Sequence, residues 1–199
     1  MDRAKNLRER IAYYRRHLGE GVSAEIASVY LREIAKAEAE LRRIERGDEG
    51  TTDAMNRRLE WNDAFAIGHT LLDAQHRDLI RLINRLCVAL DTKADMTAKH
   101  PDLRALLHAA KEHFEHEIAV LKAIVAGPAP DHAKAIGASA MGEHASAHDR
   151  ALGELHAIVA RIEHALADDL PRHADELITW FVVHAIKHDA NLKAVFQAM

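Results

Sequence analysis

Metal-ligating side chains recur at helical spacing along this sequence of 199 residues, which contains 15 histidines. His113 and Glu117 lie four residues apart, and so do His144 and His148, so on a helix each pair projects to one side about one turn apart. Imidazole nitrogens and carboxylate oxygens are common ligands of metal ions. Burying several such groups without a cation would cost free energy, so the spacing predicts a metal site.

Two further segments carry candidate ligands. One contains His76, and the other contains His184, His188 and Asp189. His184 and His188 share a helix face, whereas Asp189 is rotated by about 140° from His184 on an ideal helix. Asp189 would join the site only through a local distortion such as a π-bulge, or from the edge of the site. The spacing alone therefore leaves both His188 and Asp189 as candidates.

Four long helices are expected to position these residues. They are predicted over residues of about 70–90, 102–126, 132–167 and 171–198. Their ends are marked by the polar stretch Asp91–Pro101, by Gly127–Pro130 and by Asp169–Pro171. The low content of Gly (9) and Pro (4) favours helix throughout. Because short connections join long helices as antiparallel neighbours, we predict an all-α, up-down-up-down four-helix bundle in which every helix carries a candidate histidine.

The connection between the second and third of these helices has two interpretations. Glu117 lies about nine residues before the Gly127 break, whereas His144 lies about 12 residues after a helix start near residue 132. The two residues are then not level along the bundle. The alternative is that the third helix begins later, with residues 127–139 forming a loop or a short extra helix.

The N-terminal segment is predicted to form a helical hairpin. Apolar residues recur at helical spacing from Leu7 to Leu18, and Ser23 is a good N-cap residue for a second helix that ends near Arg46. The apolar residues of that second helix alternate four and three apart, which is typical of a helix that pairs with another helix.

A polar, glycine-bearing stretch, Gly47–Asp53, follows the hairpin and has the composition of a linker. We therefore expect two domains, a hairpin in residues 1–50 and a bundle in residues 51–199. The hairpin would form a homodimer or dock a protein partner through residues 1–46, or else fold back on the bundle.

Composition argues against several classes of partner and location. The formal net charge is -4 and the pI is about 6.4, so no nucleic-acid or anionic-lipid partner is expected. No run of 18 apolar residues is present, so no transmembrane helix is predicted. The single cysteine, Cys87, is expected to be a core residue in a reducing compartment, and the N-terminus has no secretory pattern. A cytoplasmic location follows as the expectation.

Several motifs together resemble the bacterial hemerythrin family over residues of about 59–196. The motifs are Trp61–Phe65, Ile67–Gly68, Leu72–Leu79, Ile83–Asn84, His113–Glu117, His144–His148 and Trp180–Asp189. The resemblance implies a set of seven metal ligands: His76, His113, Glu117, His144, His148, His184 and Asp189. In that family the Asp ligand follows the His by five residues, which favours Asp189 over His188. The span from Glu117 to His144 is longer than the family pattern.

Five imidazoles and two carboxylates exceed the four ligands of a tetrahedral zinc and suit two metal ions. The resemblance implies two iron ions, with one held by His144, His148 and His184 and the other by His76 and His113. It also implies that Glu117, Asp189 and an oxo or hydroxo group bridge them. One position of the two octahedral ions then stays open, and O₂ can bind there. The remaining nearby residues, His116 and the aromatic side chains of the motifs, are expected to lie outside the ligand set.

The resemblance favours a non-haem di-iron protein that binds O₂ reversibly for carriage, storage or sensing. Only two carboxylates are present, compared with the four of ferritin-like sites, which support oxidation chemistry. The sequence shows no dedicated general acid or nucleophile beside the ligands, so no enzymatic activity is expected. Two alternatives stay open: a di-iron oxidase, peroxidase or nitric oxide scavenging enzyme, and an oxygen- or iron-responsive signalling module acting through the hairpin. Imidazole also binds zinc, copper and nickel, so residue types leave the metal open.

Overall fold

The computed structural model describes residues 3–47, 58–92 and 100–199, and in these residues it contains helices and no strand. The elements are α1 (Arg3–Gly19), α2 (Ala24–Glu45), the 3₁₀ turn η1 (Asp63–Phe65), α3 (Thr70–Asp91), α4 (Pro101–Ala126), α5 (Asp131–Glu163), α6 (Leu170–Val183), the π-helix η2 (His184–His188) and α7 (Ala190–Gln197). The predicted all-α class is confirmed.

Local sequence explains where several helices begin. The side chain of Ser23 accepts a hydrogen bond from the backbone N–H of Ile26, as expected of an N-cap. Gly21 has a φ of 81° in the turn before it, a conformation that glycine adopts without steric cost. Pro101 and Pro171 each stand in the first turn of a helix, where a missing backbone N–H removes no helical hydrogen bond.

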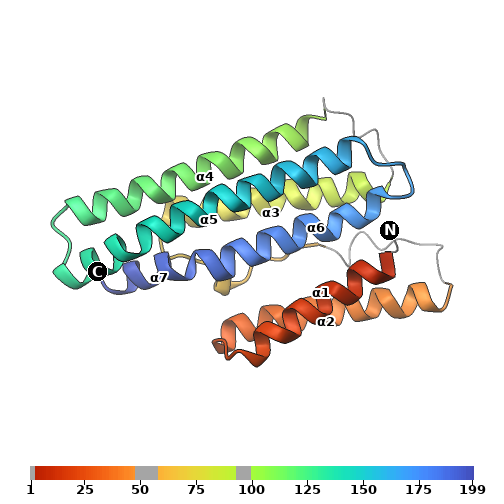
Figure 1. Ribbon diagram of the computed structural model, residues 1–199, viewed down its shortest axis with the longest axis horizontal. Helices are drawn as coiled ribbons and strands as arrows, with labels where there is room; N and C mark the ends of the chain where they lie inside the picture. Colours follow the sequence, from red (N-terminus) through yellow and green to blue (C-terminus); the bar gives the residue numbers. More distant parts are fainter. Residues whose placement is uncertain (1–2, 48–57, 93–99) are drawn as a thin grey trace.

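The long helices pack side by side along their lengths (Figure 1). α3 contacts α4 and α6, α4 contacts α5, and α5 contacts both α6 and α7. Buried apolar side chains from these helices fill the space between them. No helix within the described ranges is both long enough and apolar enough to cross a lipid bilayer.

The connection between α4 and α5 is short. α5 begins at Asp131, directly after the Gly127–Pro130 turn, and continues for 33 residues. The interpretation in which residues 127–139 form a loop or a short extra helix was therefore wrong. A Cβ atom added to Gly137 would lie 3.3 Å from Cγ2 of Val125 on α4, so the missing side chain permits a close approach of the two helices. Both helices therefore stay continuous and packed beyond the candidate ligands.

The last predicted helix, over residues of about 171–198, is divided into two α-helices by a π-helical turn. α6 ends at Val183, and the π-helix η2 follows over His184–His188 before α7 begins. A π-helical turn takes in an additional residue and so changes the rotation between His184 and Asp189. The distortion that Asp189 needs to reach the site is therefore present.

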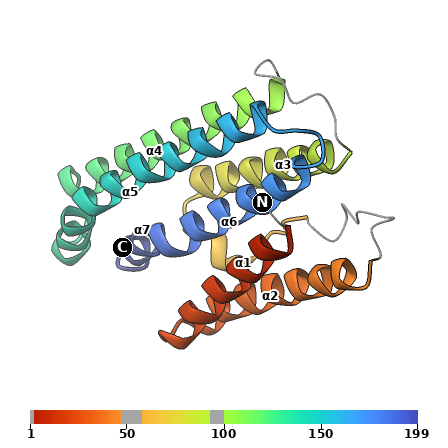
Figure 2. The same ribbon diagram turned by 45° about the vertical axis from the view of Figure 1, so that its right-hand side comes forward.

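α1 and α2 form the helical hairpin that the N-terminal sequence predicts. They pack against each other, and the rings of Tyr14 and Tyr30 stack with centroids 5.1 Å apart. Figure 2 shows the hairpin alongside α6, and α1 contacts α6 while α2 contacts η1. Its buried side chains belong to the same contiguous core as those of α3 to α6. Apart from Gly47, the predicted linker Gly47–Asp53 falls outside the described residues, as does the boundary after residue 50, so the domain division stays a prediction.

Candidate metal centre

The predicted ligands converge in the interior of the molecule from four different parts of the chain. α3 contributes one, α4 two, α5 two, and η2 with the residue after it contributes two more. None of them is more than 5% exposed: His76, His113, Glu117, His144, His148, His184 and Asp189. The structure thus brings together all the residues that the hemerythrin resemblance selects.

Three imidazoles surround the carboxylate of Glu117. Nε2 of His113 lies 3.3 Å from one carboxylate oxygen, Oε1. Nε2 of His144 lies 3.1 Å from the other oxygen, Oε2, and Nε2 of His148 lies 2.8 Å from that same atom. The two oxygens of Glu117 therefore face different histidines.

The carboxylate of Asp189 has an equivalent arrangement. Its Oδ2 lies 3.2 Å from Nε2 of His76, and its Oδ1 lies 3.4 Å from Nε2 of His184. Ligand atoms of the described residues also gather into two groups within which all lie less than 4.8 Å apart. These groups are His76, His113, His184 with Asp189, and Glu117, His148, His184 with Asp189. His184 and Asp189 stand in both groups, so the groups adjoin.

Most of these atoms approach each other without forming hydrogen bonds. Only the pair of His144 and Glu117 has hydrogen-bond geometry. The buried atoms without a hydrogen-bond partner include Nε2 of His76, His113, His148 and His184, Oε1 of Glu117, and both carboxylate oxygens of Asp189. Two ligands about 2.1 Å from one ion and at right angles to each other would lie about 3 Å apart. The spacing and the unsatisfied lone pairs therefore fit residues that hold metal ions.

Outer contacts orient two of the histidines with Nε2 toward the centre. Nδ1 of His76 donates to the carbonyl oxygen of Phe65 at 2.7 Å when Nε2 carries the free lone pair. Nδ1 of His113 lies 3.3 Å from Oε1 of Gln75, and the amide nitrogen of Gln75 lies 2.7 Å from Nδ1 of His116. His116 is thus an outer residue, as the sequence predicts.

Gln75 was missed by the sequence analysis. It directly precedes His76 and is only half-buried, so its position on the helix does not separate it from ordinary surface residues. Its contacts with two residues of α4 become visible only when α3 and α4 are placed side by side. The one local signal is a polar amide adjoining a predicted ligand.

Burial and the neighbouring carboxylates shift the pKa values of the ligand rings in opposite directions. Burial lowers the pKa of His113 to about 3 and that of His184 well below its ordinary value, so both rings are neutral at pH 7. Against the effect of burial, Asp189 raises the pKa of His76 and Glu117 raises that of His144. Neutral imidazole is the form that binds metal ions. Burial together with the negative charge of Glu117 raises the pKa of Asp189 to about 6. The two carboxylates thus repel each other unless a cation lies between them.

Aromatic rings line the cluster. Phe114 stacks on His148 with ring centroids 4.3 Å apart, and Trp180 stacks on His184 with centroids 6.2 Å apart. The Trp180 Nε1–H donates to the carbonyl oxygen of Ala151 at 2.8 Å, which ties α6 to α5. These rings restrict the ligand side chains and exclude water from them.

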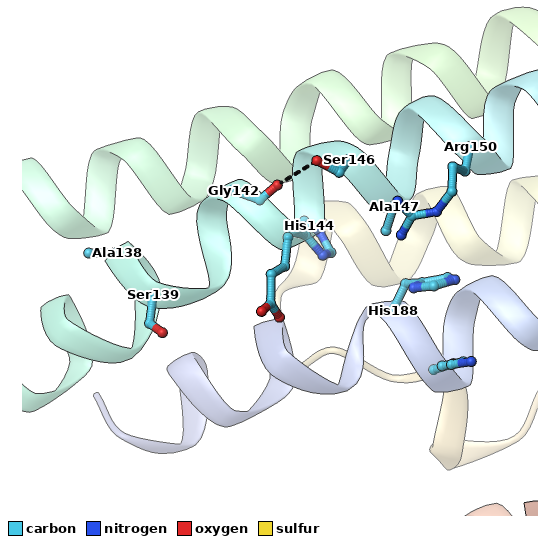
Figure 3. Close-up of a pocket in the computed structure, with 10 residues that line it drawn as sticks. Ala138, Ser139, Gly142, His144, Ser146, Ala147, Arg150 and His188 are labelled. Carbon is cyan, nitrogen blue, oxygen red and sulfur yellow. Dashed lines mark hydrogen bonds between the residues drawn. The ribbon is translucent and has the colours of Figure 1, made fainter.

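His188, the alternative to Asp189, lies outside the cluster. It is half-buried and lines a cavity of about 690 Å³ between α5 and η2, together with Arg150 and Lys187. Figure 3 shows His188 and Arg150 near His144, which forms part of the same cavity wall. Asp189, at 2% exposed, therefore takes the position that the simple helical spacing would have assigned to His188.

No family model, no curated protein and no solved structure matches this chain. The resemblance to the hemerythrins therefore depends on the motifs and their spacing. The geometry of the cluster provides a separate physical argument for bound metal.

Proposed function

We propose that this chain is a hemerythrin-like, non-haem di-iron protein that binds O₂ reversibly for carriage, storage or sensing. The observation that carries the proposal is the convergence of five buried imidazoles on two buried carboxylates whose oxygens lack other partners. Such a cluster is costly without cations, because most of its lone pairs have no hydrogen-bond partner and both carboxylates are shielded from water.

The proposed assignment gives each carboxylate a bridging role. His144, His148 and His184 would hold one ion, and His76 with His113 would hold the other. Glu117 turns one oxygen toward His113 and the other toward the pair on α5, so its oxygens face both sets. Asp189 likewise turns one oxygen toward His76 and the other toward His184.

An iron pair bound there would supply the position for O₂ and the electrons that accompany its binding. The chain's own contribution is to orient the ligand rings, to shield them from water and to lower the pKa of His113 and His184 by burial. The outer contacts of His76 and His113 direct Nε2 inward, while Phe114 and Trp180 cover ligand rings. Exclusion of water would keep solvent protons away from a ligand bound at the open position.

The fold that we propose around this site is an up-down-up-down bundle of α3, α4, α5 and the α6–η2–α7 segment. The contacts of α3 with α4, α4 with α5, α5 with α6, and α6 with α3 support a closed ring of four neighbours. A cytoplasmic location and the absence of nucleic-acid partners stay predictions from composition.

Metal analysis combined with optical spectroscopy tests the proposal. Purified, reduced protein is expected to hold two irons per chain and to develop a visible band in air that disappears when O₂ is removed. The His113→Ala variant should lose at least one metal per chain. His108→Ala on the same helix is the matched control, because its side chain is 81% exposed. Zinc in place of iron, or both metals retained by His113→Ala, would contradict the proposal.

The enzymatic alternatives predict a different result in the same experiment. An oxidase or peroxidase would consume O₂ or peroxide continuously in the presence of a reductant and would show no reversible band. A nitric oxide scavenger would consume nitric oxide catalytically. Steady-state consumption measured with an electrode separates these activities from stoichiometric O₂ binding.

A further inference from the structure

The N-terminal hairpin supplies none of the candidate ligands, yet it contacts elements that position them. α1 lies against α6, which leads directly into η2, and α2 lies against η1 (Figure 1). His184 belongs to η2, and the backbone of η1 holds the ring of His76. The hairpin therefore contacts two elements that hold candidate ligands: α6, which leads into His184, and η1, which holds the ring of His76.

The contact between α1 and α6 contains a buried ion pair. Nη1 of Arg10 donates to Oδ1 of Asp175 at 2.8 Å, and the two side chains are 7% and 6% exposed. A buried ion pair adds little net stability, because desolvation of both charges offsets their attraction. It does select one arrangement, since any shift of α1 along α6 would leave two buried charges unpaired. The pair thus favours the present position of the hairpin on α6 over shifted ones.

Asp175 lies on α6, the helix that leads into the candidate ligand His184. Trp180 follows on α6 and stacks on His184, the first residue of η2. Packed helices move largely as rigid units, so a displacement of α6 at Asp175 would be passed on to His184.

The contact between α2 and η1 bears on another candidate ligand, His76. The carbonyl oxygen of Phe65, the last residue of η1, accepts the Nδ1–H of His76 at 2.7 Å. A cavity of about 340 Å³ lies beside this contact, and its walls include Ser23 and Ile26 from the hairpin together with Asp189. The hairpin therefore also borders the surroundings of a second candidate ligand.

We infer that the hairpin is a positioning element of the metal centre, held in place by the Arg10–Asp175 ion pair. Through α6 it keeps His184 in place, and through η1 it keeps His76 in place. Arg10 and Asp175 are positioning residues that touch no metal themselves. The inference rests on the proposed metal centre and gives the hairpin a role within its own chain.

The test measures the rate of metal loss from the full-length chain. Arg10→Met, Asp175→Leu and the double variant are loaded with iron under anaerobic conditions and diluted into excess chelator. Metal content is measured over time, and the fluorescence of Trp180, whose ring stacks on His184, provides a second signal that iron bound there would quench. Arg8→Met is the matched control, since it removes the exposed ion pair with Glu45 within the hairpin.

Wild type and Arg8→Met are expected to lose metal at the same rate. The single variants and the double variant should lose it about tenfold faster, as when outer contacts of a metal site are removed. The double variant replaces both charges with apolar groups, so its melting temperature should stay near that of wild type. Arg10→Lys keeps a positive charge opposite Asp175 and should therefore lose metal more slowly than Arg10→Met. This conservative variant still tests the inference if one of the others fails to fold.

Two results would overturn the inference. In one, all variants retain metal as long as wild type does. In the other, the double variant regains the wild-type rate together with its melting temperature, which would mean that the ion pair acts only through stability. A wild-type chain that binds no metal would instead overturn the metal centre itself, and this is visible before any variant is compared.

Discussion

Two groups of buried charged and polar residues in this molecule differ in the partners that their charges find within the protein. Between the hairpin and α6, Arg10 and Asp175 neutralise each other directly at 2.8 Å. In the centre of the long helices, imidazoles and two carboxylates meet with only one hydrogen bond among the Nε2 atoms and carboxylate oxygens. In the first pair the protein supplies one charge of each sign, although Nε of Arg10 and Oδ2 of Asp175 have no hydrogen-bond partner. In the second cluster most of the facing atoms are lone-pair donors without a partner, an arrangement that is compatible with a metal site.

The largest expected effect comes from removing the carboxylate that three imidazoles share. Glu117→Ala should reduce the metal content to fewer than one ion per chain, because both proposed ion positions lose a ligand. Glu115→Ala on the same helix, with a side chain that is 65% exposed, should leave the content unchanged. Elemental analysis measures the metal content of both variants. Two ions per chain in Glu117→Ala would show that this carboxylate is not needed to bind metal.

The ion pair between the hairpin and α6 should respond strongly to loss of one partner. Asp175→Ala leaves the Arg10 guanidinium buried without its counter-charge, so we expect the free energy of unfolding to fall by about 3 to 5 kcal/mol. Glu45→Ala, which breaks an exposed pair with Arg8, should cost at most about 1 kcal/mol. Denaturant titrations of the metal-free proteins provide the measurement. Equal losses in the two variants would show that burial of the pair has no energetic consequence.

Gln75 offers a smaller change that leaves the ligand set intact. Gln75→Leu removes the acceptor for Nδ1 of His113, so the ring loses the contact that orients Nε2. We expect metal affinity to fall by about 10- to 100-fold with little change in the melting temperature. Competition with a chelator of known affinity measures this. An unchanged affinity would indicate that packing alone orients His113.

The pH dependence should be the mildest effect and should distinguish the central cluster from the ion pair. Burial and the charge of Glu117 raise the pKa of Asp189 to about 6, so lowering the pH through this value protonates the carboxylate before metal binds. Metal binding must then displace that proton, and the apparent affinity should fall by about tenfold for each further pH unit from this group alone. Calorimetry in buffers of different ionisation enthalpy should detect more protons released at pH 6 than at pH 8. Equal release at both values would contradict the raised pKa.

Sequence patterns predicted the local elements well and their connections less well. The starts of α2, α4 and α6 follow from the N-cap Ser23 and from prolines in the first helical turn, Pro101 and Pro171, and both effects act within a few residues. The continuation of α5 through residues 131–139 was misjudged in one interpretation, because it depends on close packing of Gly137 against α4. Such packing depends on the neighbouring helix, so the sequence around Gly137 does not reveal it.

In the candidate site, too, features within one helix were predictable from the sequence and contacts between helices were not. His113, Glu117, His144 and His148 were recognisable because a helix brings residues four apart to one side. Gln75 was not recognisable, because its partners belong to another helix. Asp189 was selected over His188 by resemblance to a family pattern, and the π-helix provides the physical reason for its position.

The sequence by itself determined the helical class, the limits of most helices and the spacing of the ligands within each helix, since all of these depend on interactions between near neighbours. Only the tertiary structure decided that the carboxylates face two sets of imidazoles and that the hairpin lies on α6. Arg10 and Asp175 are 165 residues apart in the chain, and nothing in either neighbourhood indicates the other. They pair because a charge buried next to the hydrophobic core is stable only beside a charge of opposite sign. Which two charges are buried together depends on the tertiary fold.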